Sequence, residues 1–291
     1  MKHFLVIFLL IIISFSAKAQ LQLINDSLLI DGHYRTFHYY RPKQKEASII
    51  FVLHGSGGNG LQMVKVSERL HERAQQENML LVFPEGYKHF WNECRKASTA
   101  LANTENIDEN TFFTKMIAYL KAKYQADDKK AYAIGFSGGG HMAYKLALTM
   151  PQQFKAITAI VANLPTDDNM DCGEMKKPVA VMIINGTGDP TNPYKGGMMK
   201  SEGVVLGNVR STEETFNYWA KIDGYNGKPV KEMVPDQDPS DDITIEKYTY
   251  SDNTRPDVVL YKVINGQHEF PKGMDAFVTS WEFFKQQMSK N

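Results

Sequence analysis

The sequence has no excess of charge of either sign. Its 33 Lys and Arg residues are balanced by 33 Asp and Glu residues, so the formal net charge is zero. A nucleic-acid-binding protein usually carries a basic excess or a basic cluster, and this chain has neither. It also has no cluster of His and Cys with the spacing of a zinc site. We therefore expect no nucleic-acid partner, no metal and no other cofactor.

Long hydrophobic runs are scarce, and the one such run lies at the N-terminus. Residues 4–13 are uninterruptedly apolar, follow the basic start Met1–His3 and precede a small-x-small pair, Ala17 and Ala19. This pattern predicts a signal peptide over residues 1–19, cleaved after Ala19. An uncleaved membrane anchor is the alternative, but the run is short for a bilayer span of ~20 residues. We expect a secreted or periplasmic protein without stable membrane insertion.

Internal repeats, linkers and cysteines are also few. No stretch rich in Pro or Ser divides residues 20–291, which predicts one domain and leaves the oligomeric state open. The two cysteines, Cys94 and Cys172, suggest one disulfide in an exported chain. Such a long closed loop could stabilise the fold by ~4 kcal/mol on the chain-entropy account. Two separate buried thiols are the other interpretation, and the sequence does not decide between them.

Apolar runs with β character alternate with helical patterns from residue 48 to residue 185. Strands are expected at 48–53, 79–83, 131–134, 154–161 and 179–184, and helices at 61–77, 108–124 and 141–149. This order predicts a mostly parallel sheet with helices on both faces. Around it we expect a hairpin of 21–30 and 33–40, a strand at 258–264, helices at 211–222 and 274–288, and irregular chain at 87–106 and 191–210.

The most informative stretch contains Gly135-x-Ser137-x-Gly139. It lies between an expected strand and an expected helix, which is the context of a nucleophile elbow. Glycines are required there because side chains would collide with the strand or the helix. An ordinary Gly-rich turn is the alternative interpretation. The pattern predicts that Ser137 stands exposed at the top of the sheet as a nucleophile.

A serine nucleophile needs a base, and the base needs an acid that fixes its tautomer. Asp189 follows the strand expected at 179–184, and His268 follows the strand expected at 258–264. Both come after Ser137 in the order serine, acid, histidine that this sheet architecture uses. Three other carboxylates compete for the acid role but precede the strand instead of following it, namely Asp167, Asp168 and Asp171.

An acyl-transfer site also needs two N–H donors for the oxyanion. The amide of Gly138, directly after the nucleophile, is the first candidate. The Gly-rich loop that begins at His54 supplies the second, which we assign to the backbone of Ser56. A plain turn is the alternative for this loop. A phosphate-binding loop is excluded because the required Lys-Ser/Thr is missing.

Several further residues are possible substrate contacts or core residues. Trp91, Tyr194 and Phe270 could stack on an aromatic acyl group or a sugar ring, although core packing is the favoured explanation for each residue taken singly. His141, four residues after Ser137, is expected to pack or to line the pocket floor. The acidic loop 236–242 has alternate carboxylates, but it lacks the Gly and terminal Glu of an EF-hand and is expected to be solvated.

From about Asp31 to the C-terminal helix, the chain resembles the polyhydroxybutyrate depolymerase/feruloyl esterase family, secreted α/β-hydrolases that cleave carboxylic esters. The matching stretches are DGHYRTFHYYRP, VLHGSGGNG, FPEG, WNEC, IDENTFF, GFSGGGHMAYKLA, NGTGDPTNPY and GQHEFP. The resemblance implies Ser137, Asp189 and His268 as nucleophile, acid and base, Ser56 as an oxyanion donor, and Trp91 near the acyl pocket.

The stretch around the base departs from the family pattern. The family commonly has Gly-Gly-Gly-His-Thr-Trp-Pro there, whereas this chain has Asn-Gly-Gln-His-Glu-Phe-Pro at residues 265–271. The resemblance therefore implies an esterase without fixing its substrate. We expect feruloyl or acetyl esters on plant polysaccharides, and the alternative is a polyester depolymerase. Two other classes stay open: a serine peptidase on the same fold and a non-catalytic binding module.

Overall fold

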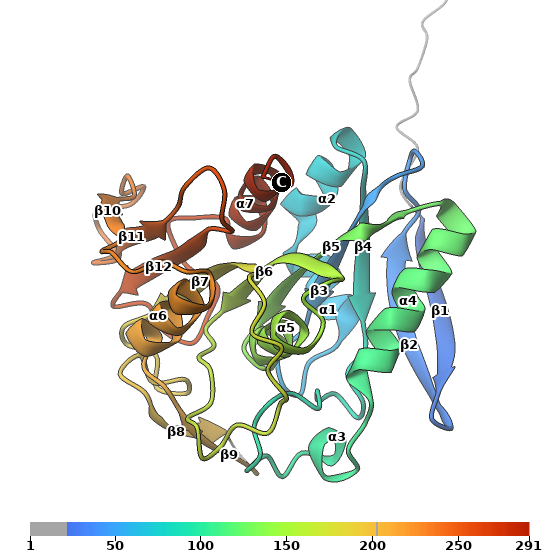
Figure 1. Cartoon of the computed structure of the whole chain (residues 1–291), viewed down its shortest axis with the longest axis horizontal. Coiled ribbons are helices and arrows are strands. Elements are labelled where there is room, and N and C mark those ends of the chain that lie inside the picture. Colours follow the sequence, from blue (N-terminus) through green and yellow to red (C-terminus); the bar gives the residue numbers. More distant parts are fainter. Residues whose placement is uncertain (1–21, 202, 291) are drawn as a thin grey trace, which may run out of the picture.

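The computed structural model describes residues 22–201 and 203–290. Its main feature is a sheet of ten strands in the order β1-β2-β4-β3-β5-β6-β7-β12-β11-β10 (Figure 1). The strands are β1 (Leu23–Ile30), β2 (His33–Tyr40), β3 (Ser48–Leu53), β4 (Met79–Pro84), β5 (Asp127–Phe136), β6 (Phe154–Ile160), β7 (Ala180–Gly186), β10 (Val230–Met233), β11 (Thr244–Tyr250) and β12 (Val258–Ile264).

The centre of the sheet is parallel and its two edges are antiparallel. Strands β4, β3, β5, β6, β7 and β12 pair in parallel. The β1–β2 hairpin closes one edge, with Ile30 opposite His33, and β11 and β10 add antiparallel strands to the other. The predicted mostly parallel sheet and N-terminal hairpin are therefore confirmed, while β10 and β11 were not predicted.

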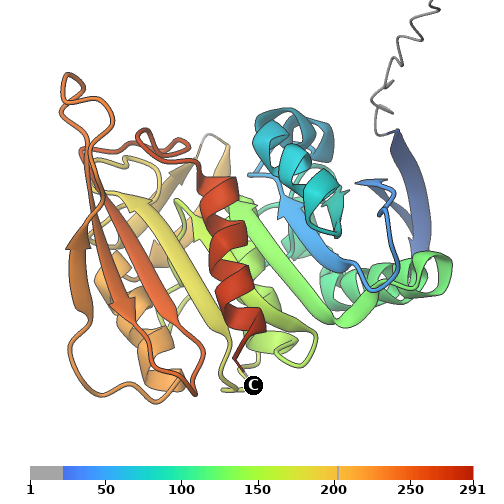
Figure 2. The same cartoon turned by 90° about the horizontal axis from the view of Figure 1, so that it is seen from above.

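Helices cover both faces of the sheet, as predicted (Figures 1 and 2). One core contains side chains of the helices α4 (Glu109–Tyr124), α5 (Gly138–Thr149) and α6 (Thr212–Ile222). The other contains side chains of α1 (Gly60–Val66), α2 (Glu68–Gln76) and α7 (Ala276–Met288). Along β3, Phe51 faces the first core and Val52 the second, because successive side chains of a strand point to opposite faces. A strand buried on both faces explains the continuous apolar runs.

Two expectations about local structure were wrong. The helix expected at 61–77 is divided into α1 and α2 at Ser67, whose Oγ donates to the Met63 carbonyl at 2.7 Å. The stretch 191–210, expected to be irregular, contains a separate hairpin of β8 (Gly197–Ser201) and β9 (Val204–Val209). The short helix α3 (Leu101–Thr104) lies in the otherwise irregular stretch 87–106. The helix expected at 211–222 is α6, and Ser211 and Glu214 form a capping box at its start.

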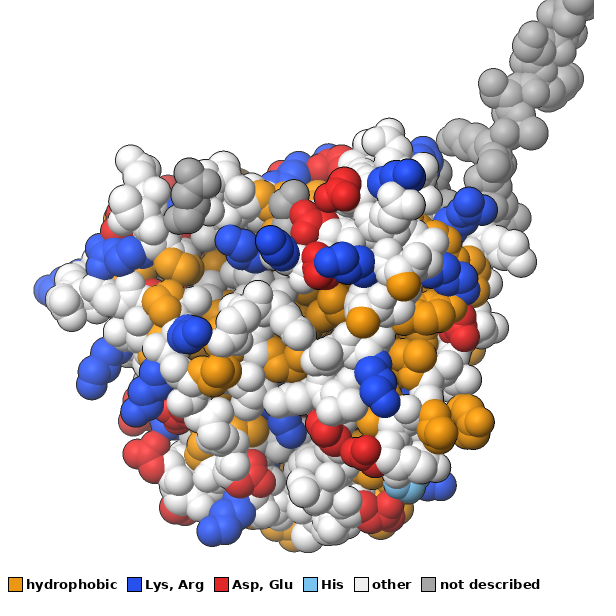
Figure 3. All heavy atoms as spheres, turned by 45° about the vertical axis from the view of Figure 1, so that its right-hand side comes forward, with side chains coloured by type: hydrophobic (Ala, Val, Ile, Leu, Met, Phe, Trp, Pro, Cys, Tyr) orange, Lys and Arg blue, Asp and Glu red, His pale blue; other side chains and the backbone are white. Residues whose placement is uncertain are grey.

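Within the described residues, no helix is long and apolar enough to cross a bilayer. The signal peptide predicted at residues 1–19 lies outside the part of the chain that the structure describes. Figure 3 shows Lys and Arg side chains interspersed with Asp and Glu over one face of the molecule. That face therefore presents no broad field of one sign, in agreement with the balanced composition.

Asp223, at the end of α6, is a buried carboxyl with an unusual titration. Among the residues that the structure describes, one of its oxygens accepts from the Val179 amide at 3.2 Å and the other has no partner. Burial, with a smaller effect of the Asp257 charge, raises the pKa of Asp223 to about 8. The folded state therefore holds a proton that the unfolded chain releases near pH 4, so stability is lost as pH rises from about 4 to about 8.

We predict that Asp223→Asn removes this loss. The amide stays neutral, so the variant should exceed the wild type by more than about 1 kcal/mol in free energy of unfolding at pH 9, with a smaller difference at pH 5. Urea unfolding at both values of pH measures it. Asp168→Asn, at an exposed position, is the control and should leave the pH dependence unchanged. A stability difference that is the same at both pH values would show that Asp223 does not titrate this way.

Candidate active site

The turn from β5 into α5 holds Ser137 in a strained conformation. Its φ is 50° and its ψ is −116°, a combination that is uncommon for a residue other than Gly. The turn is held by the Ser137 amide, which donates to the Ile160 carbonyl at 2.8 Å. A Cβ on Gly135 would lie 2.0 Å from the Gly139 oxygen, and one on Gly139 would lie 2.4 Å from the Leu53 oxygen. The glycines are therefore needed for strand and helix to approach, as in a nucleophile elbow.

The loops after β7 and β12 bring two further side chains to Ser137. Nδ1 of His268 lies 2.7 Å from Oδ2 of Asp189, and Nε2 lies 2.8 Å from Oγ of Ser137. An ionised carboxylate only accepts hydrogen bonds, so Nδ1 carries the proton and Nε2 accepts from the serine hydroxyl. Three residues far apart in sequence thus form one hydrogen-bonded chain because β5, β7 and β12 end at the same edge of the sheet.

Asp189 is fixed in place by the backbone that follows it. Its Oδ1 accepts from the amides of Thr191 and Asn192, each at 2.8 Å, which leaves Oδ2 for His268. The Asp189 side chain is only 2% exposed, whereas that of His268 is 18% exposed. Asp189 is therefore a buried carboxylate of fixed orientation next to a partly exposed imidazole. In such an arrangement the carboxylate holds the base in one tautomer.

The three competing carboxylates do not reach this site. Asp167 is 95% exposed and pairs with Arg210 at 2.5 Å. Asp168 and Asp171 are also exposed. Asp189, which follows β7, reaches His268, whereas the three acids that precede this strand stay at the surface. The position of an acid before or after its strand therefore predicted which one reaches the base.

The amides of Ser56 and Gly138 lie next to each other beside Ser137. A Cβ on Gly138 would lie 2.9 Å from the Ser56 nitrogen and 2.5 Å from its Oγ. Gly138 is the first residue of α5, so its amide has no acceptor within the helix. The Ser56 loop is shaped by the Gly57 amide, which donates to the His89 carbonyl at 2.9 Å. Two N–H groups near a serine hydroxyl can stabilise an oxyanion.

His54 supports this loop and was not predicted to do so. It is fully buried; its Nδ1 donates to the Gly55 carbonyl at 2.7 Å, and its Nε2 accepts from the Gly86 amide at 2.9 Å. Burial lowers the pKa of His54, which keeps the imidazole neutral and able to accept. The loop carbonyl next to Ser56 is thereby fixed. Two short patterns in the sequence could have indicated this contact: the His-Gly pair directly after β3, and Phe-Pro-Glu-Gly at 83–86.

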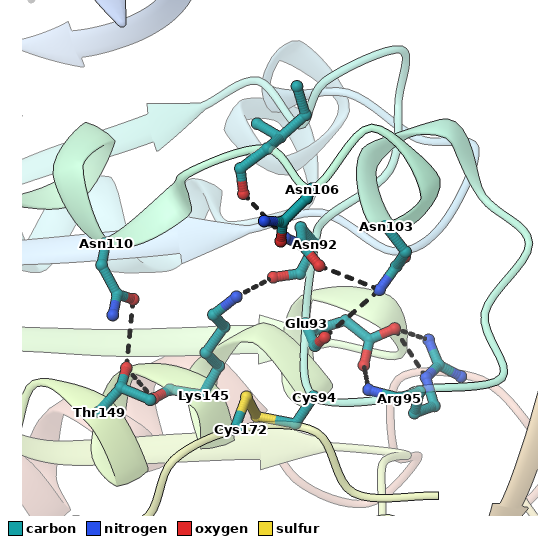
Figure 4. Close-up of a disulfide and its surroundings, with 11 residues drawn as sticks. Asn92, Glu93, Cys94, Arg95, Asn103, Asn106, Asn110, Lys145, Thr149 and Cys172 are labelled. Atoms are coloured by element: carbon teal, nitrogen blue, oxygen red, sulfur yellow. Dashed lines mark hydrogen bonds and ion pairs between the residues drawn. A yellow bond between two sulfur atoms is a disulfide. The ribbon is translucent and has the colours of Figure 1, made fainter. Parts of the chain in front are cut away.

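Trp91 also contacts the loop that begins at His54. Its Nε1 donates to the His54 carbonyl at 2.9 Å, and the two rings lie 4.8 Å apart. The segment after Trp91 is cross-linked by a disulfide between Cys94 and Cys172 (Figure 4). The two cysteines are therefore paired and are not two separate thiols. In the same view, Nζ of Lys145 donates to the Asn92 carbonyl at 2.5 Å. The loop that begins at His54 therefore contacts a segment that the disulfide cross-links.

The predicted substrate contacts are packed side chains in this structure. Trp91 is 2% exposed, Tyr194 is 7% exposed and His141 is 2% exposed. Both ring nitrogens of His141 lack a partner among the described residues, and burial lowers its pKa well below the usual value. Core packing, the simpler of the two interpretations, agrees with these positions, and a direct contact with substrate stays a prediction. Within the described residues, no group of three or more His, Cys, Asp and Glu could hold a metal ion.

Comparison with known proteins places this geometry in a family. A profile described as phospholipase/carboxylesterase matches residues 36–217, which include the loop around Ser56, the elbow and Asp189. The chain belongs to the phospholipase/carboxylesterase family of α/β-hydrolases. The resemblance to feruloyl esterases noted in the sequence is also confirmed, because several relatives carry that name.

Curated relatives of this carboxylesterase-family chain are distant, and each aligns with only part of it. A protein classed as feruloyl esterase C in Aspergillus niger is 27% identical over 65% of this chain and 68% of its own length. Feruloyl esterase C of Emericella nidulans is 28% identical over 56% of this chain and 57% of its own. NocK of Nocardia uniformis subsp. tsuyamanensis, classed as an esterase, is 27% identical over 77% of this chain and 66% of its own. The chain thus spans about two thirds or less of these relatives.

Solved structures share the fold of this family member. An acetyl xylan esterase from Aspergillus awamori superposes with a TM-score of 0.61 at 16% identity, covering 90% of this chain and 99% of that one. The Bacillus cereus carboxylesterase has a TM-score of 0.53 at 16% identity, covering 87% of this chain and 94% of that one. At these identities the likeness establishes the α/β-hydrolase fold.

Proposed function

We propose that this chain is a serine carboxylesterase that works through an acyl-enzyme. The observation that carries the proposal is the continuous hydrogen-bonded chain from Asp189 through His268 to Ser137 at the elbow. His268 Nε2 takes the hydroxyl proton as Ser137 Oγ attacks the ester carbonyl, and Asp189 stabilises the imidazolium that forms. The same imidazolium then gives its proton to the leaving alkoxide, and an acyl-serine remains.

Hydrolysis of the acyl-serine repeats these steps with water. His268 takes a proton from the attacking water, and Ser137 leaves as the alcohol with that proton. In both halves, negative charge develops on the former carbonyl oxygen. The Ser56 and Gly138 amides are the proposed donors to this oxygen, and the N-terminus of α5 favours negative charge there. Residues 20–291 form the proposed catalytic domain, exported by the signal peptide to the periplasm or the medium.

The proposed substrates are feruloyl or acetyl esters carried by plant polysaccharides. The names of the curated relatives support this choice, and the neutral composition agrees with an uncharged polymer. A polyester depolymerase is the second candidate, because the sequence also resembles that group. A serine peptidase on the same fold would need subsites for a peptide chain, and rates on an aminoacyl-anilide relative to p-nitrophenyl acetate distinguish it.

A panel of methyl ferulate, acetylated xylan and polyhydroxybutyrate granules tests the substrate class, with Ser137→Ala as the blank. We expect the wild type to cleave methyl ferulate or acetylated xylan faster than it releases hydroxybutyrate from granules. A polyester depolymerase must bind an insoluble solid through an apolar surface or a second domain. Release from granules, with no activity on the other two substrates, would make the polyester reaction the primary one.

A further inference from the structure

A groove crosses the molecule on the side of the sheet covered by α7. One cavity of about 370 Å³ lies between the α1–α2 pair and the chain before α7, and its wall includes Val66, Arg69 and Phe270. A second, of about 440 Å³, continues toward β10 and β11 and reaches Glu232 and Lys247. The two share their central lining, namely Gln237, Gly273, Met274 and Asp275. They therefore form one continuous groove. Figure 2 shows the start of α7 between the α1–α2 pair and the β10–β11 strands.

An aromatic side chain links the groove to the turn of the proposed catalytic serine. Phe270, in its wall, comes two residues after His268. Its ring lies 4.4 Å from that of Phe136, the residue directly before Ser137, and 5.2 Å from that of Phe277 at the start of α7. Phe136 in turn lies 5.7 Å from the His268 ring. Phe270 therefore connects the wall of the groove to the turn that carries Ser137 and to the loop that carries His268.

The charges of the groove cancel in pairs. Arg69 and Asp275 form an ion pair at 3.3 Å, and Lys247 and Glu232 form another at 3.3 Å. Uncharged hydrogen-bonding groups also line it, including the exposed amide of Gln237. A neutral groove with many donors and acceptors and an aromatic wall suits a polymer rich in hydroxyl groups, whose sugar rings can stack on a Phe face.

A hydrophobic polyester chain suits the same groove less well. The ester groups of such a chain accept hydrogen bonds but donate none, so burying the carboxylates of Asp275 and Glu232 and the amide oxygen of Gln237 against it would leave these acceptors desolvated without new partners. Two apolar side chains at the groove are clearly exposed, Val66 at 49% and Met233 at 58%, and they belong to α1 and β10, at opposite ends of the groove. They do not form one apolar patch of the kind that would hold a solid polymer surface.

We infer that the groove from Phe270 to the β10–β11 strands binds the uncharged polysaccharide chain that carries the ester, on the leaving-group side of Ser137. This inference rests on the proposed esterase function and adds a binding site outside the triad. Groove contacts are made equally in the ground state and in the transition state. Their removal should therefore raise KM for a polymer and leave kcat nearly unchanged.

The test uses the full mature chain with Arg69→Ala and Gln237→Ala combined. Both side chains are exposed, so the fold should persist. We expect KM for acetylated xylan to rise at least fivefold, with kcat within twofold and kcat/KM for p-nitrophenyl acetate unchanged. Lys155→Ala, at an exposed position at the amino end of β6, is the matched control. It should leave KM and kcat for acetylated xylan, and kcat/KM for p-nitrophenyl acetate, unchanged.

The outcomes separate failure of the groove from failure of the esterase proposal. An equal KM for acetylated xylan in the double variant, the control and the wild type would overturn the groove. Wild-type activity on p-nitrophenyl acetate without activity on acetylated xylan would also overturn it and keep the esterase. A selective loss of hydroxybutyrate release from granules in the double variant would assign the groove to a polyester instead. No hydrolysis of p-nitrophenyl acetate by the wild type would remove the esterase proposal itself.

Discussion

Replacing Ser137 by Ala is expected to lower kcat for p-nitrophenyl acetate by about 10⁴-fold or more. The substitution removes the oxygen that lies 2.8 Å from Nε2 of His268 and leaves the backbone bonds of the elbow in place. Ala carries the same strain as Ser at a φ of 50°, so the fold and its stability should be preserved. Initial rates at saturating substrate, with circular dichroism of both proteins, measure the effect.

A serine far from the elbow provides the control for this experiment. Ser289→Ala removes an exposed hydroxyl near the C-terminus, whose donor bond goes to the Gln286 carbonyl, and should leave kcat within twofold. The residual rate of Ser137→Ala would come from the oxyanion donors and from binding alone. A residual rate within tenfold of wild type would place the nucleophile on another residue.

Asp189→Asn should lower kcat by a similar factor, about 10⁴-fold, although it changes one oxygen to nitrogen. The amides of Thr191 and Asn192 donate to one side of this group and would retain the Asn oxygen there. The Asn nitrogen would then face Nδ1 of His268 as a donor. Nδ1 must accept, so the ring proton moves to Nε2, which can no longer take the proton of Ser137.

Asp167→Asn is the matched control, because it makes the same chemical change at another loop carboxylate. Asp167 is 95% exposed and pairs with Arg210, so its substitution should change kcat less than twofold. Steady-state rates on p-nitrophenyl acetate compare the two variants. If Asp167→Asn proved the more damaging, Asp189 would not be the acid of the site.

The meeting of Ser137, Asp189 and His268 could be predicted from sequence because three local patterns and one rule of topology determine it. Each residue follows an apolar run with β character, and the carboxyl ends of parallel strands meet at one edge. The strand-then-residue order also distinguished Asp189 from Asp167, which precedes its strand. The parallel centre of the sheet, most of the helices and the elbow were predictable because each depends on short-range periodicity and on glycine geometry.

Structure with a weak local pattern, or with partners far away in the sequence, was not predictable from one sequence. The pattern of β8 and β9 is short and interrupted by Gly, and the hairpin has a small core of its own, with Met199, Leu206 and Val209. The two roles of Trp91, stacking or packing, have the same sequence signal. Only its bond to the His54 carbonyl shows that it supports the loop that begins there. The cysteine pairing likewise depended on whether two loops meet.

The groove was also beyond sequence reasoning, for a physical reason. Its walls come from α1 and α2, the loop after β12 and the β10–β11 strands, which are separated by most of the chain. Nothing in the local pattern around Arg69 or Gln237 relates one to the other. Phe270 was recognised as a possible stacking surface, but its direction became clear only from its packing on Phe136 and Phe277.

Covalent labelling with a fluorophosphonate tests the central claim most directly, because the reagent reacts with a serine only where a base and an oxyanion site activate it. We expect one label per chain, located by peptide mass spectrometry on Ser137, with loss of p-nitrophenyl acetate hydrolysis in proportion to labelling. Asp189→Asn should be labelled far more slowly, and Asp167→Asn at the wild-type rate. A label on a different residue, or full activity after stoichiometric labelling of Ser137, would contradict the account.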